Sequence, residues 1–164
     1  MTSYRRIDSQ RLLCPSAHCE EGALLVGVIG AEGKIAYINP ALPVDKSFRE
    51  RAFTGRTPEH RFRFAATCQE SGCMHWTGTR CGVIDQAIEA AEATKNRECV
   101  SKPLPKCGIR MQCRWFAQRG SYACGTCPFL FNYVWPDTSS GGQSSFQKRE
   151  VQQPCQIYQI TNSR

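Results

Sequence analysis

The sequence predicts a small α+β domain in which an N-terminal β-hairpin, further short strands and two main helices surround cysteine-rich loops. Three observations lead to this class. Segments of strand length lie in the first 70 residues, helical patterns follow, and eleven cysteines are distributed over 164 residues. A chain of this length buries a core without crosslinks, so chemistry explains the cysteines better than stability does.

The N-terminal part is predicted to form the hairpin. Residues 1–21 are polar and irregular, whereas residues 22–39 contain two apolar segments separated by a turn. Gly33 lies in that turn, where it can adopt a positive φ. Pro40 and Pro43 are expected to end the second strand, because proline cannot donate a hydrogen bond to a neighbouring strand.

A short helix is expected within residues 44–57. Asp45 or Ser47 can cap it, since both side chains accept hydrogen bonds from the backbone N–H groups at a helix start. The apolar side chains that we expect to face the core are Phe48, Ala52 and Phe53.

Residues 59–68 predict a strand with two different faces. Phe62 and Phe64 alternate with Arg61 and Arg63, so one face is aromatic and the other is basic and solvated. Arginines beside aromatic rings also offer cations for phosphate and rings for stacking on bases, which makes nucleic acid an alternative partner. That alternative depends on Arg49, Arg51, Arg56, Arg61 and Arg63.

The clearest helix is predicted to begin at residue 82. Its apolar residues repeat at helical spacing along one stripe, which consists of Val83, Ile84, Ala87, Ile88 and Ala91. Cys81 directly precedes this helix, so its thiolate would lie near backbone N–H groups that favour an anion.

Four cysteines between residues 107 and 128 form the strongest candidate for a metal centre. They are Cys107, Cys113, Cys124 and Cys127. A short helix between the two pairs is predicted by the stripe of Ile109, Cys113 and Phe116, and Gly120 is expected to end it. The two ends of this window can therefore fold toward each other. Four converging thiols suit one tetrahedral metal ion or one iron–sulfur cluster.

A second group of cysteines is one thiol short of a full set. It consists of Cys68, Cys73 and Cys81. Cys14 is our choice for the fourth ligand because, like Cys127, it is followed by a proline. The rivals for this position are Cys19, Cys99 and His75. A three-cysteine cluster with an open iron is a further alternative, and it would permit substrate binding.

The spacing of the first group favours iron–sulfur over zinc. Structural zinc sites commonly use two tight pairs, whereas five residues separate Cys107 from Cys113. A proline directly after a ligating cysteine recurs in bacterial ferredoxins. We therefore expect one or two [4Fe–4S] clusters, with zinc as the alternative cofactor. Structural disulfides, inert buried cysteines and a redox-active dithiol at Cys124 and Cys127 also stay open.

The N-terminal sequence and the charge limit the compartment and the partners. The N-terminus is polar where a signal peptide needs an apolar core, and no stretch approaches the roughly 20 apolar residues of a membrane helix. We therefore expect a cytoplasmic protein without a membrane partner, whose thiols stay reduced. The formal net charge of +7 would fall to about +3 with two four-thiolate clusters. That charge suits an acidic redox-partner protein.

Residues 1–136 are predicted to form the cysteine-rich domain, and residues 137–164 a flexible Ser/Gly-rich linker and tail. The sequence as a whole predicts an iron–sulfur protein that transfers single electrons or senses oxygen or redox state. A zinc-stabilised module that binds nucleic acid or protein is the alternative. No hydrolytic constellation or phosphate-binding loop is visible, so an accessory or sensor protein is favoured over an enzyme.

Overall fold

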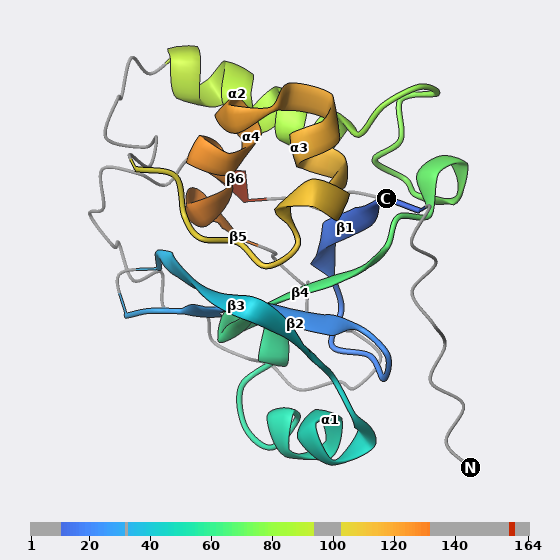
Figure 1. Ribbon diagram of the computed structural model, residues 1–164, viewed down its shortest axis with the longest axis vertical. Helices are drawn as coiled ribbons and strands as arrows, with labels where there is room; N and C mark the ends of the chain where they lie inside the picture. Colours follow the sequence, from blue (N-terminus) through green and yellow to red (C-terminus); the bar gives the residue numbers. More distant parts are fainter. Residues whose placement is uncertain (1–10, 32, 94–102, 132–157, 160–164) are drawn as a thin grey trace, which may run out of the picture.

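The computed structural model describes residues 11–31, 33–93, 103–131 and 158–159, and it confirms the α+β class. Its main sheet consists of β1 (Leu13–Ala17), β2 (Leu24–Ile29), β3 (Ile35–Pro43) and β4 (Phe62–Thr67). All neighbouring strands in this sheet are antiparallel, in the order β1-β4-β2-β3 (Figure 1). β1 and β3 are therefore its edge strands.

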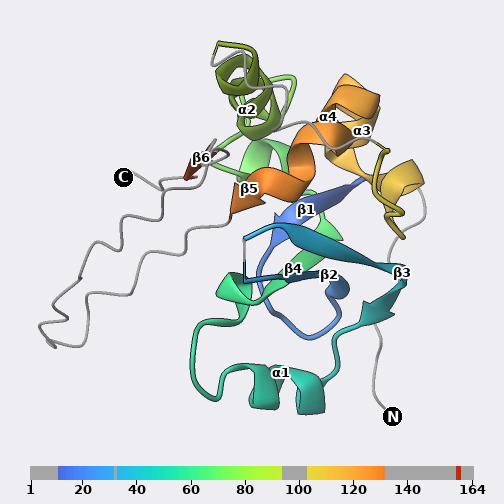
Figure 2. The same cartoon turned by 90° about the vertical axis from the view of Figure 1, so that its left-hand side faces the viewer.

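Helices cover both faces of the sheet, as Figure 2 shows from the side. On one face lies α1 (Lys46–Ala52). On the other lie α2 (Gly82–Ala93), α3 (Arg114–Arg119) and α4 (Ser121–Thr126), which pack against one another. Among the described residues, none of the helices combines the length and the apolar character that a membrane span needs.

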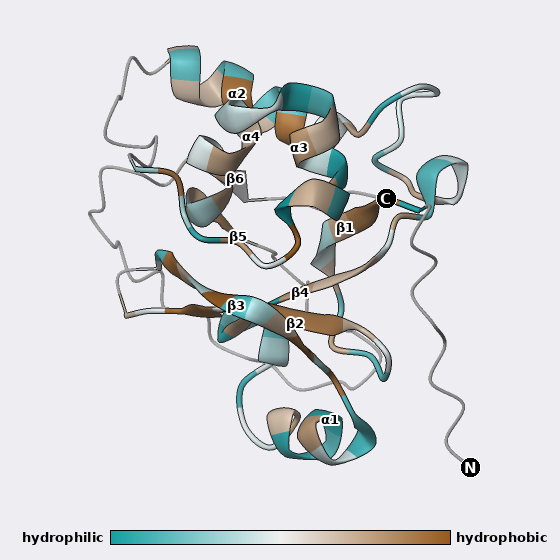
Figure 3. Cartoon of the chain, viewed as in Figure 1, coloured by the Kyte–Doolittle hydropathy of each residue, from teal (hydrophilic) through white to brown (hydrophobic). Residues whose placement is uncertain are grey.

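Two apolar cores lie between the sheet and these helices. Because successive side chains of a strand point to opposite faces, neighbouring residues of β2 enter different cores. Leu25 belongs to the core on the side of α1, together with Phe64, whereas Val26 belongs to the core beneath α2–α4, together with Ile84 and Trp115. Figure 3 shows the hydrophobic residues along β2 and β3 between the two helical layers.

β2 and β3 form the predicted hairpin, and Gly33 in its turn has a φ of 76°. The prediction that Pro40 ends the second strand is wrong, because β3 continues through it, whereas the strand does end at Pro43. The pairing of β3 with β2 shifts register between the two ends of the strand, and β3 lies at the edge of the sheet. Proline is tolerated in an edge strand or at a bulge, since no ladder hydrogen bond is lost there.

β1 overturns the expectation of an irregular N-terminal segment over Leu13–Ala17. The strand pairs with β4, with Leu13 opposite Thr67 and Ala17 opposite Phe64. Its sequence has no alternation of apolar and polar residues, so pairing with a distant strand, rather than a local pattern, determines its conformation. Residues 1–10 lie outside the described residues.

Asp45 caps α1, as predicted, and its Oδ1 accepts a hydrogen bond from the backbone N–H of Phe48 across 2.6 Å. Phe48 packs edge-on against Phe62 with 5.6 Å between the ring centroids, and Ala52 is buried. The prediction for Phe53 is wrong, because its side chain is 51% exposed. Phe53 follows the last residue of the helix and so leaves the inward-facing stripe.

α2 begins at the predicted residue, and all five of its predicted inward-facing side chains are buried. The next helix begins at Arg114 rather than near Ile109, because a 3-10 turn (Arg110–Gln112) precedes it. It ends before Gly120, as predicted. The sequence does not predict α4, which carries Cys124.

A short parallel pair closes the described structure. β5 (Leu130–Phe131) pairs with β6 (Tyr158–Gln159), which belongs to the predicted tail. The other residues of 137–164, including Cys155, lie outside the described residues, and so does Cys99. The domain boundary at residue 136 therefore stays a prediction.

Candidate metal centres

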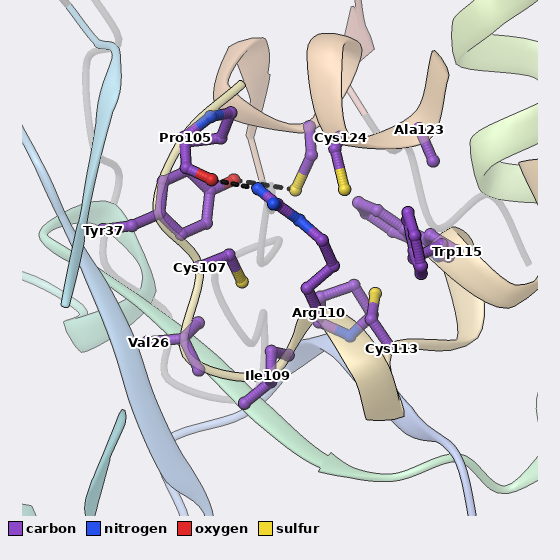
Figure 4. Close-up of a pocket in the computed structure, with 13 residues that line it drawn as sticks. Val26, Tyr37, Pro105, Cys107, Ile109, Arg110, Cys113, Trp115, Ala123 and Cys124 are labelled. Atoms are coloured by element: carbon purple, nitrogen blue, oxygen red, sulfur yellow. Dashed lines mark hydrogen bonds between the residues drawn. The ribbon is translucent and has the colours of Figure 1, made fainter. Parts of the chain in front are cut away.

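The four cysteines of the 107–128 window border one cavity, which we call site 1. Its lining includes Cys107, Cys113, Cys124 and Cys127. Cys107 lies in the connection before α3, Cys113 is the N-cap of α3, Cys124 lies in α4, and Cys127 begins the 3-10 turn that follows. Figure 4 shows three of these thiols, those of Cys107, Cys113 and Cys124, on different sides of the cavity.

Two glycines give the chain the shape that site 1 needs. Gly108 lies so close to β3 that an added Cβ would stand 2.7 Å from the Ala41 backbone nitrogen and 3.1 Å from the Ile38 carbonyl oxygen. Gly120 has a φ of 57° at the reversal between α3 and α4. Glycine adopts such a conformation at low cost, and α4 can thus return Cys124 toward Cys113.

Two groups from the sheet act on the thiol of Cys127. The Tyr37 hydroxyl donates a hydrogen bond to Cys127 Sγ across 2.8 Å. Arg63 is 1% exposed, and its guanidinium donates to the carbonyl oxygens of Leu130 and Pro15. Burial raises the pKa of Cys127, while the Arg63 charge and the Tyr37 hydrogen bond act in the opposite direction. Both groups therefore favour a negative sulfur at this position.

Burial favours the neutral form of two further thiols of site 1, those of Cys113 and Cys107. Burial raises the pKa of Cys113 to about 12, although the backbone N–H groups of Phe116 and Trp115 oppose the shift. Burial also raises the pKa of Cys107, against the N–H groups of Ile109 and Arg110. A bound cation would replace these protons and turn the thiols into thiolate ligands.

Arg110 limits the space inside site 1. Its side chain crosses the cavity between the thiols, and its guanidinium donates to the Pro105 carbonyl oxygen (Figure 4). The remaining cavity measures about 20 Å³, which is room for about one water molecule. The buried Nε of Arg110 has no hydrogen-bond partner within the described part of the chain. A group larger than one ion therefore requires Arg110 to move toward solvent.

The second group of cysteines borders another cavity, which we call site 2. Its lining includes Cys14, Cys68, Cys73 and Cys81. This cavity is larger, at about 450 Å³, and it lies between β1, the end of β4 and the start of α2. The structure thus gathers around one space the four cysteines that the sequence analysis assigned to a second centre, and their role as ligands stays a prediction.

The pairing of β1 with β4 explains why Cys14 joins this group. Leu13 pairs with Thr67, and the Cys68 backbone N–H donates to the Leu12 carbonyl oxygen across 2.9 Å. Cys14 itself pairs with Ala66, two residues before Cys68, and both cysteines border the same cavity. Burial and, to a smaller extent, the neighbouring thiols of site 2 raise the pKa of Cys14 to about 12.

The rivals of Cys14 take other places. Cys19 is 1% exposed in the core on the α1 side, where its backbone N–H donates to Glu59 Oε1 across 2.8 Å. Cys99 lies outside the described residues. His75 borders the cavity of site 2, and its backbone N–H lies 3.5 Å from Cys73 Sγ as a weak donor. Cys14 is therefore the best-placed fourth cysteine among those described.

Cys81 lies at the N-terminus of α2, as predicted. Burial raises the pKa of Cys81, while the N–H groups of Val83 and Ile84 and the Trp115 indole act in the opposite direction. The Gln118 amide, on α3, holds the Cys81 backbone at both ends: Oε1 accepts from its N–H and Nε2 donates to its carbonyl oxygen, each across 2.9 Å. This amide joins the helix of site 1 to a cysteine of site 2.

The nine described cysteines form no disulfide with one another. Among the described residues, no three His, Cys, Asp or Glu side chains are arranged to hold a metal ion as the side chains stand. The thiols of each site surround a cavity instead of meeting at one point.

The arginine-rich strand differs from its predicted form. Arg63 does not lie on a solvated face, because it is buried beneath site 1 and bonded to backbone carbonyl groups. Arg61 is half-buried, stacks on Phe62 at 5.1 Å and donates to the Ala52 carbonyl oxygen. The other three predicted contact residues, Arg49, Arg51 and Arg56, are exposed.

Sequence reasoning missed four contributors to these sites. They are Tyr37, Arg63, Arg110 and Gln118. Tyr37, Arg63 and Gln118 act on residues far away in the chain: Tyr37 and Cys127, for example, lie 90 residues apart. Comparison with protein-family models, curated proteins and solved structures finds no significant match.

Proposed function

We propose that this protein binds two [4Fe–4S] clusters, one at each site, and uses them to transfer or to sense single electrons. One observation carries the proposal: eight of the nine described cysteines fall into two sets of four, and each set borders its own cavity. A stability role would not require such a division, since apolar side chains fill a core without thiols.

The cavity of site 2, at about 450 Å³, offers room for such a cluster, whereas site 1 requires Arg110 to move toward solvent first. Zinc requires four ligands at about 2.1–2.3 Å from one point, whereas a four-iron cluster accepts thiolates around its outside. When bound, such a cluster supplies a reversible one-electron couple. The chain supplies soft sulfur ligands, a buried guanidinium at Arg63 and the Tyr37 hydroxyl, which together stabilise negative charge at site 1.

The two sites differ in their access to solvent, and this difference supports different roles. Cys113, Cys124 and Cys127 of site 1 are each less than 10% exposed. Cys14, Cys68 and Cys73 of site 2 are half-buried around the larger cavity. Shielding favours a stable couple at site 1, whereas site 2 is more open to a partner or to oxygen.

We further propose a cytoplasmic location and an acidic redox partner. The absence of disulfides among the nine described cysteines is consistent with a reducing compartment. The net charge of +7, or about +3 with two dianionic four-thiolate clusters, favours encounter with an acidic surface.

Anaerobic measurement of iron, sulfide and zinc per chain tests the proposal. We expect about eight iron and eight sulfide, a number that follows from two four-iron clusters. The double variant Cys124→Ala with Cys127→Ala should lose half of both, and so should Cys68→Ala with Cys73→Ala. Cys19→Ala is the matched control, because Cys19 is a buried cysteine that borders neither cavity. Stoichiometric zinc without sulfide would instead support the zinc-stabilised module, and a folded protein without iron, sulfide or zinc would refute metal binding.

A further inference from the structure

The two sites share a wall. Trp115, which is 1% exposed, borders both cavities. On β1, Cys14 borders site 2 and the next residue, Pro15, borders site 1. A backbone bridge also joins Leu13 to Cys113. One indole ring and one strand thus separate the two sets of thiols.

The indole nitrogen of Trp115 is buried and lacks a partner that meets hydrogen-bond geometry within the described residues. A buried donor without an acceptor is uncommon in a folded protein and calls for an explanation. The indole borders the cavity of site 2 together with Cys81. It is therefore suited to donate to a sulfur that carries more negative charge than a neutral thiol does.

The shared wall is held in place from both sides. α3 carries Trp115, and the Gln118 amide on the same helix binds the Cys81 backbone through two hydrogen bonds. Asp85 of α2 forms a further link, with Arg119 Nε 3.5 Å from its Oδ1. The position of the indole relative to both sites is thus fixed by the packing of α2 and α3.

We propose that the two sites form an electron-exchange pair, with the Trp115 indole as the positioning residue between them. The inference depends on the proposed two-cluster function. A single electron leaves one site and arrives at the other, while no bond forms or breaks and no proton moves. Site 2, with its half-buried thiols, exchanges the electron with the external partner, and site 1, which is shielded from solvent, holds the electron.

Electron paramagnetic resonance of the fully loaded, dithionite-reduced protein tests the pair. If the sites exchange electrons across one side chain, the two reduced centres lie close enough for their spins to interact. We therefore expect a split or broadened signal in the intact protein and a simple signal in each double cysteine variant. Eight iron per chain with two independent, unbroadened signals would overturn the pair while leaving the two-cluster function standing. A chain without iron and sulfide would reject the function itself.

Trp115→Phe tests the indole more directly, because it keeps an aromatic ring and removes the N–H. We expect unchanged iron content and a more negative reduction potential at site 2, since the N–H that would donate to a ligand sulfur is removed. Tyr122→Phe is the control, because it also removes a donor from an aromatic side chain, and Tyr122 is 68% exposed and borders neither cavity. Equal site 2 potentials in wild type and Trp115→Phe would overturn the role of the indole. If Trp115→Phe loses iron, the spin interaction measured in the intact protein decides whether the two sites form a pair.

Discussion

The hydroxyl of Tyr37 donates a hydrogen bond to the sulfur of Cys127 across 2.8 Å, and this contact ties β3 to the cysteine-rich half of the chain. Burial raises the pKa of Tyr37 well above its ordinary value, and the nearby Cys127 raises it further. The hydroxyl therefore keeps its proton at neutral pH and remains a donor whether Cys127 is a thiol or a thiolate.

Tyr37→Phe should make the reduction potential of site 1 more negative. The ring still fills the space, but the sulfur loses a donor that stabilises added negative charge. The free energy of unfolding should fall by about 1 kcal/mol, the usual contribution of one hydrogen bond. A potentiometric titration and a urea titration measure the two effects. Tyr122→Phe is the control, since Tyr122 is 68% exposed, and an unchanged site 1 potential would contradict the expected role of Tyr37.

Gly108→Ala should remove the group bound at site 1 and spare site 2. The added Cβ would meet the β3 backbone at 2.7 Å, so the connection that carries Cys107 must move away. We expect about half of the iron and sulfide to be lost from anaerobic preparations. Gly30→Ala is the matched control, because the nearest atom to its Cβ lies at an ordinary 3.5 Å. Full iron content in Gly108→Ala would show that Cys107 is not a ligand.

Arg63→Met should destabilise the protein by about 2–3 kcal/mol, because the carbonyl groups of Leu130 and Pro15 lose a charged donor inside the core. The loss should be larger for the loaded protein than for the metal-free one, since the buried cation also offsets thiolate charge near Cys127. Urea unfolding of both forms measures the difference. Arg51→Met, at an exposed position, should change either value by less than about 0.5 kcal/mol. An equal loss in both forms would limit Arg63 to a structural role.

The His18–Glu59 pair should make stability depend on pH. The hydrogen bond to Glu59 raises the pKa of His18, so its contribution is fully present below pH 6.5 and is lost as pH rises through the raised value. Burial acts to raise the pKa of Glu59, but its bonds to His18 and to the Cys19 N–H outweigh burial and lower it. Its contribution is present above pH 4.5 and is lost as pH falls through the lowered value.

His18→Gln tests this dependence, because glutamine keeps a polar side chain and does not titrate. We expect the decline in the free energy of unfolding above pH 6.5 to become shallower than in wild type, measured by urea titration in steps from pH 5 to pH 8.5. His60→Gln, at an exposed position in the same part of the fold, is the control. Identical slopes in wild type and His18→Gln would contradict the linkage.

Local patterns predicted much of the secondary structure. The hairpin of β2 and β3, the cap of α1 and the buried stripe of α2 each depend on neighbours within a few residues, and all three are confirmed. β1 and the continuation of β3 through Pro40 depend on partner strands or on position at the sheet edge. A local sequence pattern does not indicate which strand will pair with a segment or whether that segment will lie at the edge of a sheet.

The sequence by itself determined that cysteines occur in two groups, that Cys81 precedes a helix and that Cys14 is the preferred addition to the second group. Only the tertiary structure decided that Cys14 and Cys68 border one cavity, because the register of β1 on β4 places Cys14 opposite Ala66, two residues before Cys68. It also decided that Arg63 is a buried cation rather than a surface contact, and that Trp115 borders both sites. Spacing along a chain encodes near neighbours, whereas these contacts join segments that only the packing of helices on the sheet makes adjacent.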